Sequence, residues 1–538
     1  MVLNLLLMLG CGSPTDEPAV VHDSGVLDDA ERSLDAVAFL TRVSLDLRGI
    51  RPSLEEIEAV ESDPDQVIAY IDEFLYDERF GDRVMALFSE IYQTQSDTPL
   101  VFYSDLTTNY PRMVQAIGEE PLRILAHIAE NDLPYHTVVT ADWTMANEFI
   151  GEVWPVNYPE GETGWQQVNY TDGRPAAGIL TTNSLWWRYT STYANANRGR
   201  ANAISRILFC SDYLVRPIEF DRDVNLLDEG AINEALQNNE GCVACHATLD
   251  PLSAYLWGFY YNSDIEIDVT YYHPEREYWW EDATDVPPSF YGVPSYNLED
   301  LGQQIAADPR LPQCVTEQVF SQLLQRAVVL GDTAALSSLR EELLAEDLTL
   351  RALIRAVMLR PEYRSEDPDG AGTPRKLTRP DMLASQLEDL TGFRFTYSDY
   401  DMLTTDGYGL RTLAGGIDGG FVTSPAPQVN ATLSLSLERV AQAAAWYVVG
   451  NDKSDPSNAR LFTEIGFTET PESNRESMAA QLQLLHLRVL GNRIDANGPE
   501  VEANLELWQD LYEVEGDPAA AWAGVLSVLI RDPDFLFY

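Results

Sequence analysis

The sequence predicts a mainly α-helical fold of several packed helical domains, with a small aromatic β-hairpin inserted near a Cys-x-x-Cys-His segment. Three patterns support this prediction. Apolar residues recur at helical spacing, as in Phe39, Val43 and Leu47. Ser53 followed by Glu56 three residues later is a capping box, which marks the start of a helix. Apolar and polar residues alternate over 265–269, which predicts a strand of the hairpin.

The N-terminal part is expected to be helical from 30 to 142. Its first helix ends at Gly49, its second begins after the Ser53 cap, and a third covers about 66–76. One sequence pattern recurs over 324–363 and 487–535. It consists of an arginine followed by a Leu-Gly pair that ends a helix, then two amphipathic helices, and then a proline, an acidic residue and an aromatic residue. We interpret this recurrence as a helical unit used at least twice; the alternative is chance similarity between amphipathic helices.

The composition and the hydrophobic periodicity of the sequence change twice in the middle of the chain. The stretch 143–174 combines Gly, Pro, Trp and Tyr with little periodicity and predicts a long loop or an irregular sheet. Helical spacing returns over 198–209. Aromatic residues then dominate 255–291, where the hairpin is expected.

The chain is strongly acidic, with 35 basic and 86 acidic residues among 538 and a net charge of −51. Nucleic acid and anionic membrane surfaces are therefore poor partners, because both require a basic face. The chain is 45% apolar and 10% aromatic, which is ample for packed cores. The charge indicates a solvated, salt-adapted surface, or else a cationic or metal-ion partner.

The N-terminus predicts export. A short apolar run, 2–9, is followed by Gly10-Cys11, and the segment resembles a bacterial lipobox in which Cys11 becomes lipidated. Residues 12–29 are rich in Pro, Ser, Gly and Asp and predict a flexible tether. The expected location is the cell envelope, at the outer membrane or in the periplasm, with a lipid anchor as the only membrane attachment. The alternative is an apolar N-terminus without an export role.

Cys242-Val243-Ala244-Cys245-His246 is the most specific motif, since the chain has only 5 cysteines and 6 histidines. Two thiols one helical turn apart can add to the two vinyl groups of a haem, and the adjacent His246 then binds the iron. The sequence thus predicts haem c as cofactor. The alternatives are a Cys242–Cys245 disulfide or a redox pair; a zinc site would need two further ligands.

The other side of the iron has three candidate occupants. His273 ranks first and Met358 second as the sixth ligand, and an open or water-occupied position ranks third. After Cys11 and the motif are accounted for, Cys210 and Cys314 remain. In an exported protein they are candidates for a disulfide.

Several segments together carry a resemblance to a known family: 45–49, 177–182, 197–202, Cys210, 242–246, 250–252, 308–310 with Cys314, and 533–536. They resemble the planctomycete-type cytochrome c-like proteins, a family of large extracytoplasmic, multidomain proteins also found in myxobacteria. The resemblance covers most of 35–364 and, more loosely, 375–538. It implies export, a c-type haem at the motif and no assigned substrate.

These observations predict an exported lipoprotein that carries one covalent haem and transfers single electrons at the cell envelope, without a catalytic role. Its redox partner would dock through a basic face. The runner-up is a non-haem surface binding or scaffold protein in which Cys242–Cys245 is a disulfide and the aromatic hairpin binds glycan or a protein partner. A haem peroxidase would need an open sixth position and a distal acid or base, for which Arg276 or His273 would serve.

The expected domain organisation follows the same landmarks. The segments are 1–10, a lipoprotein signal peptide; 11–29, a tether; 30–142, an N-terminal helical domain; 143–260, a cytochrome c-like segment; 261–299, the aromatic hairpin insertion; 300–364, a helical module; 365–374, a linker; and 375–538, a C-terminal helical domain.

Overall fold

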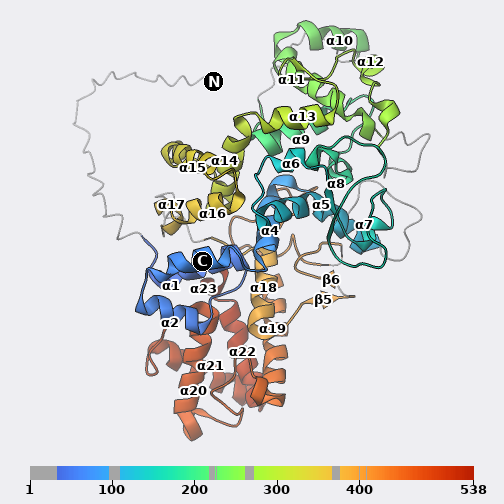
Figure 1. The fold of residues 1–538 in the computed structure, drawn as a ribbon. Helices are drawn as coiled ribbons and strands as arrows, with labels where there is room; N and C mark the ends of the chain where they lie inside the picture. The colour runs from blue at the N-terminus through green and yellow to red at the C-terminus, as the bar shows by residue number, and fades with distance from the viewer. Residues whose placement is uncertain are drawn as a thin grey trace, which may run out of the picture.

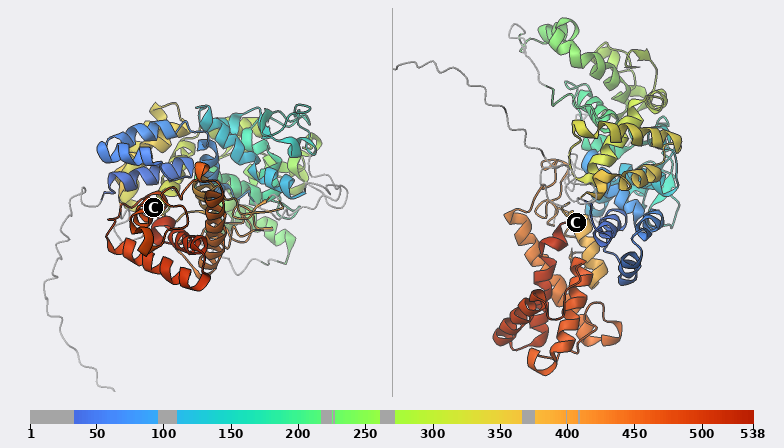
Figure 2. Two further views of the ribbon diagram at one scale, coloured as in Figure 1. Left: turned by 90° about the horizontal axis from the view of Figure 1, so that it is seen from below. Right: turned by 90° about the vertical axis from the view of Figure 1, so that its left-hand side faces the viewer.

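The computed structural model describes residues 33–95, 110–216, 225, 227–260, 272–365, 376–398, 400–407 and 409–538. Within these ranges the fold is mainly α, as predicted, with 23 α-helices and three small two-stranded antiparallel sheets. Figures 1 and 2 show an elongated molecule, with α10–α12 at one end and the C-terminal helices at the other. Cys11, the tether, the 265–269 strand and most of the 365–374 linker lie outside the described residues.

The first part of the chain forms one large helical body. Its elements are α1 (Ala36–Arg48), α2 (Leu54–Ser62), α3 (Gln66–Phe74), α4 (Phe80–Tyr92), α5 (Tyr110–Glu130), α6 (Thr137–Thr140), β1 (Thr144–Ala146), α7 (Glu148–Gly151), β2 (Gln166–Val168), η2 (Gly178–Thr181), α8 (Asn183–Arg188), α9 (Arg198–Phe209), α10 (Glu229–Asn238), α11 (Glu240–Ser253), η3 (Ala254–Phe259), η4 (Pro274–Arg276), α12 (Trp280–Ala283), β3 (Ser289–Phe290), β4 (Val293–Pro294), α13 (Leu298–Ala306), α14 (Arg310–Leu324), η5 (Leu330–Asp332), α15 (Thr333–Ala345), α16 (Leu350–Met358) and α17 (Pro361–Arg364).

The second part is a smaller helical domain. Its elements are α18 (Pro380–Thr391), β5 (Thr396–Tyr397), β6 (Tyr400–Asp401), α19 (Ala431–Ser454), η6 (Pro456–Asn458), α20 (Pro471–Leu485), the π-helical turn η7 (His486–Leu490), α21 (Pro499–Glu515), α22 (Pro518–Ile530) and α23 (Pro533–Leu536). Two separate hydrophobic cores correspond to these parts: one extends from Phe39 to Tyr363, with Leu487 added, and the other from Leu377 to Leu536. Residues from 30–142, 143–260 and 300–364 all contribute to the first core.

The N-terminal helices form as their sequence predicts. Phe39, Val43 and Leu47 are buried on one face of α1, which ends where Gly49 adopts a left-handed conformation with φ 73°. The capping box at α2 is present in both directions. The backbone N–H of Ser53 donates to Glu56 Oε2 at 2.7 Å, and that of Glu56 donates to Ser53 Oγ at 3.2 Å. Helix α9 has the predicted bounds.

The same order of elements appears twice, in agreement with the repeated sequence pattern. After α14 come α15, α16 and the short α17, and after η7 come α21, α22 and the short α23. Both short helices begin with a proline in the first turn, at Pro361 and Pro533. The proline fixes φ for a helix start and has no N–H that would be left unpaired there.

The described aromatic stretch is less regular than a single hairpin. Over 272–299 it forms η4, α12 and the small β3–β4 pair, in which Ser289 lies opposite Pro294. The irregular stretch after Trp143 contains the short β1–β2 pair, with Thr144 opposite Val168. Among the residues placed by the structure, no helix is long and apolar enough to cross a membrane.

Candidate functional site at the Cys-x-x-Cys-His helix

The motif lies in α11, at the end of the molecule opposite α20 (Figure 1). Asn239 caps this helix: its Oδ1 accepts the backbone N–H groups of Gly241 and Cys242 at 3.0 and 3.4 Å. Cys242, Cys245 and His246 follow at positions i, i+3 and i+4. At 3.6 residues per turn these positions share one face of the helix. The local sequence therefore presents two sulfurs and an imidazole within one turn.

Both motif cysteines are free thiols, so the alternative of a Cys242–Cys245 disulfide is not formed in this structure. Each is half-buried, and Cys245 packs at the edge of the large core. The side chain of His246 is 25% exposed. All three residues of the motif are thus partly exposed.

His246 is held by a carboxylate one turn further along the helix. Its Nδ1 lies 2.9 Å from Oδ1 of Asp250, and Asp250 is nearly fully buried, at 6% exposure. Arg198, at the start of α9, donates to both carboxylate oxygens, from Nε at 2.6 Å and from Nη2 at 3.1 Å. The result is a chain of contacts from α9 through Asp250 to His246.

The charge state of Asp250 follows from these contacts. Burial opposes its ionisation, but the hydrogen bonds and charges of His246 and Arg198 outweigh burial and hold the pKa of Asp250 below its usual value. An ionised carboxylate can only accept hydrogen bonds, so the proton shared with His246 belongs to Nδ1. Within the part of the chain that the structure describes, Nε2 of His246 has no hydrogen-bond partner and its lone pair is available for a metal.

Asp250 and Arg198 are functional candidates that the sequence analysis did not single out as site residues. A sequence signal for Asp250 exists, because residues i and i+4 of a helix are neighbours and Asp250 stands four positions after His246. No comparable signal marks Arg198, which is 52 residues away from Asp250 along the chain.

His273, the first candidate for a sixth ligand, lies beside η3. Its backbone N–H donates to the carbonyl of Gly258 at 2.8 Å, and its Nδ1 lies 3.1 Å from Oε1 of Glu275. His246 is seven residues before the end of α11 at Ser253, about 10 Å along the axis at 1.5 Å per residue, and η3 follows that end. None of these contacts brings His273 to His246.

The other two predicted residues around the iron lie in packed surroundings. Met358 is fully buried in α16, which packs against α14 and α15. Arg276 is buried, donates to the carbonyl of Tyr260 at 2.6 Å, and has its guanidinium 5.3 Å from the centre of the Trp279 ring. In this structure the guanidinium of Arg276 is thus engaged in a structural contact.

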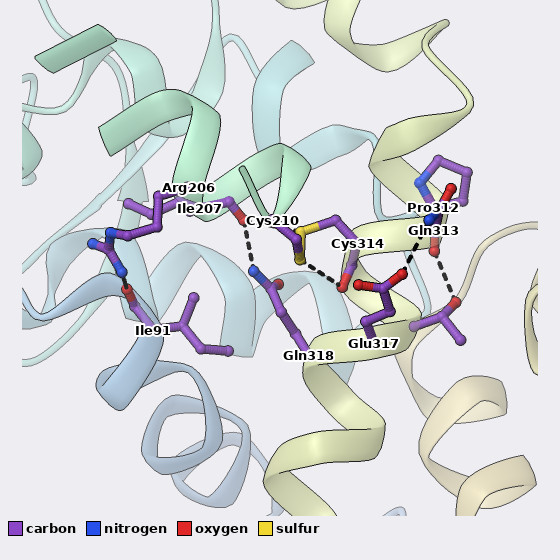
Figure 3. The surroundings of a disulfide bond; sticks show 10 residues. Ile91, Arg206, Ile207, Cys210, Pro312, Gln313, Cys314, Glu317 and Gln318 are labelled. Atoms are coloured by element: carbon purple, nitrogen blue, oxygen red, sulfur yellow. Dashed lines mark hydrogen bonds between the residues drawn. A yellow bond between two sulfur atoms is a disulfide. The ribbon is translucent and has the colours of Figure 1, made fainter. Parts of the chain in front are cut away.

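A disulfide joins Cys210 and Cys314, the pair that remained after the other cysteines had been accounted for. Cys210 caps the C-terminus of α9, and Cys314 is buried in α14. Figure 3 shows Gln318 of α14 beside the bond, donating to the carbonyl of Ile207 at 2.8 Å. Helix α9 is thus fixed to α14 at one end and carries Arg198 at the other.

The donor set on α11 fits the groups that covalent haem attachment requires. Two free thiols at helical spacing and an imidazole with an available Nε2 are the groups that such attachment needs. Across the described ranges, no group of three or more His, Cys, Asp or Glu side chains is arranged to hold a metal ion.

The comparisons with known proteins provide no relative for this chain: no family model, no curated protein and no solved structure matches it.

Proposed function

We propose that the chain is an exported lipoprotein that carries one c-type haem on Cys242, Cys245 and His246 and transfers single electrons at the cell envelope. The observation that supports this proposal most strongly is the arrangement on α11. Two free thiols share a helix face with an imidazole whose Nδ1 is already engaged. The resemblance of the motif and its flanking segments to the planctomycete-type cytochrome c-like proteins points the same way.

The chain's own residues have three tasks in this proposal. Each thiol would add across one vinyl group of the haem: the sulfur would bond to one vinyl carbon and the thiol hydrogen would pass to the other, so that no oxidant or reductant is needed. Nε2 of His246 would bind the haem iron. When bound, the haem accepts and releases one electron through its iron. The polarity and hydrogen bonding that the protein provides around it set the reduction potential.

For the sixth position His273 remains our proposal. Replacing His273 with alanine and recording absorption spectra of both oxidation states tests it. Loss of the low-spin spectrum would support His273 as the ligand, and an unchanged spectrum would remove it.

The expected partner is a redox protein with a basic docking face. A net charge of −51 favours encounters with a cationic surface, and salt screens such attraction over about 10 Å at 0.1 M. We therefore propose that the rate of electron transfer to such a partner falls as ionic strength rises. Anchoring through Cys11 remains part of the proposal.

The test is a pyridine haemochrome spectrum of the full chain, exported in a strain that has haem-attachment machinery. The unmodified chain should give a c-type spectrum and a mass increase that matches one haem. Cys242→Ala and Cys245→Ala should each alter that spectrum. The double variant Cys210→Ser/Cys314→Ser is the control, because it removes two cysteines that lie outside the motif; its spectrum should keep the same form. Absence of haem from the unmodified chain would reject the proposal.

A further inference from the structure

Asp250 contacts Nδ1 of His246, the ring nitrogen that the proposed haem attachment does not use, and Arg198 contacts Asp250 in turn. The carboxylate is the only partner of Nδ1 among the described residues, and Arg198 binds both of its oxygens. The three side chains come from two helices, α9 and α11, that pack against each other. Nothing in the attachment chemistry itself requires either Asp250 or Arg198.

We propose that Asp250 is a positioning residue that fixes the tautomer of His246 and strengthens it as an electron donor, and that Arg198 limits this donation. The pair would thereby set the reduction potential of the haem. This proposal rests on the proposed function, since it assigns a role around the haem of that same site.

The physical reason lies in the charge on the far side of the imidazole. A carboxylate that accepts the Nδ1 proton pushes electron density toward Nε2, which stabilises the more positive, oxidised iron and lowers the potential. Arg198 places a cation on the same carboxylate and withdraws part of that density. Removing Asp250 and removing Arg198 should therefore shift the potential in opposite directions.

The first experiment uses the full chain without haem and examines the tautomer alone. With 15N-labelled histidine, of which the chain has six, His246 should give the spectrum of a ring protonated at Nδ1. The isosteric variant Asp250→Asn should lose that preference. A neutral His246 ring that is protonated at Nε2 instead of Nδ1 would overturn the proposal, whether or not haem attaches.

The second experiment measures reduction potentials of the haem-loaded chain. Asp250→Asn should shift the redox equilibrium about tenfold toward the reduced form, about 59 mV upward for one electron. Arg198→Gln should lower the potential, whereas Arg198→Lys, which keeps the cation, should restore most of it. Asp308→Asn is the matched control, because it removes one carboxylate from an arginine pair, Asp308–Arg310, without contacting His246.

Arg198 could change the reduction potential through Asp250 or through the direct electrostatic effect of its charge on the haem. A double-mutant cycle separates these two effects. If Arg198 acts through the carboxylate, Arg198→Gln should have a much smaller effect when combined with Asp250→Asn than in the unmodified chain. An equal effect in both backgrounds, or upward shifts for both single variants, would overturn the proposal.

Should Asp250→Asn fail to fold, the downward shift of Arg198→Gln still decides the proposal. A chain that never binds haem would reject the proposed function instead, and the tautomer experiment would remain decisive for the role of Asp250.

Discussion

At the scale of single residues, the disulfide constrains the helix that carries Arg198 to the site. It closes a sequence separation of 104 residues between Cys210 and Cys314. A cross-link over such a distance restricts the unfolded chain far more than the folded one, and for about 100 residues the chain-entropy estimate is about 4.7 kcal/mol. Because Cys210 ends α9, the bond also holds the helix that carries Arg198.

Replacing both disulfide cysteines with serine should lower the free energy of unfolding by about 2–5 kcal/mol. The measurement is urea denaturation of the haem-free chain under oxidising conditions. Cys242→Ser serves as control, because that thiol is free and half-buried, and a change within about 0.5 kcal/mol is expected there. Equal stability of the double variant and the parent chain would contradict a stabilising disulfide.

The same residues show what sequence reasoning can and cannot reach. Cys242, Cys245 and His246 are identifiable because their chemistry depends on spacing within one turn. Cys210 and Cys314 can be paired by elimination. The contact of Arg198 with Asp250 is beyond reach, because it exists only where α9 packs on α11.

At the scale of elements, the helices with explicit caps are the most predictable. The start of α2 is defined by the reciprocal hydrogen bonds of Ser53 and Glu56, and Glu56 also binds Arg48 through both carboxylate oxygens, each at 2.9 Å. The π-helical turn η7 after α20 has no such capping signal in the sequence, and in the fold it contacts α22 and α23. The extension of the motif helix α11 to Ser253 is likewise not predictable, since Pro251 lies within it and proline usually interrupts a helix.

Replacing Ser53 with alanine should cost about 1 kcal/mol of stability, because the N–H of Glu56 loses its acceptor at the start of α2. Thermal or urea unfolding provides the measurement. Ser62→Ala, at the other end of the same helix, is the matched control: its hydroxyl donates only to the carbonyl of Glu58, which is already within the helix. An equal loss for both substitutions would argue against a capping role.

At the scale of the whole molecule, charged groups join the two bodies. Asp46 of α1 accepts hydrogen bonds from Lys376, from the Tyr363 hydroxyl at 2.6 Å and from the Tyr538 hydroxyl at 2.9 Å. Two ion pairs lie at the same interface, and their side chains line a cavity of about 410 Å³ there: Arg83–Asp381 and Arg379–Glu90.

This interface is not predictable from the sequence. The division into a large N-terminal part and a C-terminal domain follows composition and the Pro- and Gly-rich stretch between them. The partners, however, are far apart: Asp46 and Lys376 are 330 residues from each other. Only the folded chain shows that one of its two lysines is committed to a buried ion pair.

Asp46→Asn should destabilise the protein by about 3–5 kcal/mol, because it leaves the Lys376 cation buried without its counter-charge. Denaturant unfolding of the haem-free chain measures the loss. Asp72→Asn is the control, since Asp72 and Arg355 form an exposed pair, with side chains 50% and 40% exposed, and should change stability by about 0–1 kcal/mol. Similar losses in both variants would contradict a special role for the buried pair.

The buried lysine also predicts a pH dependence of stability. Burial lowers the pKa of Lys376 from 10.5 to about 8, although Asp46 opposes the shift. Between about pH 8 and 10.5 the unfolded chain therefore keeps a proton that the folded chain has lost. The unfolded state binds more protons in this window, so this group makes stability rise with pH by up to about 3 kcal/mol.

Other buried groups, such as Tyr538, titrate at high pH as well. The quantity to measure is thus the difference in unfolding free energy between the parent chain and Lys376→Met at pH 7 to 9.5. That difference should shift in favour of the parent chain as pH rises, and a difference independent of pH would show that Lys376 keeps an ordinary pKa.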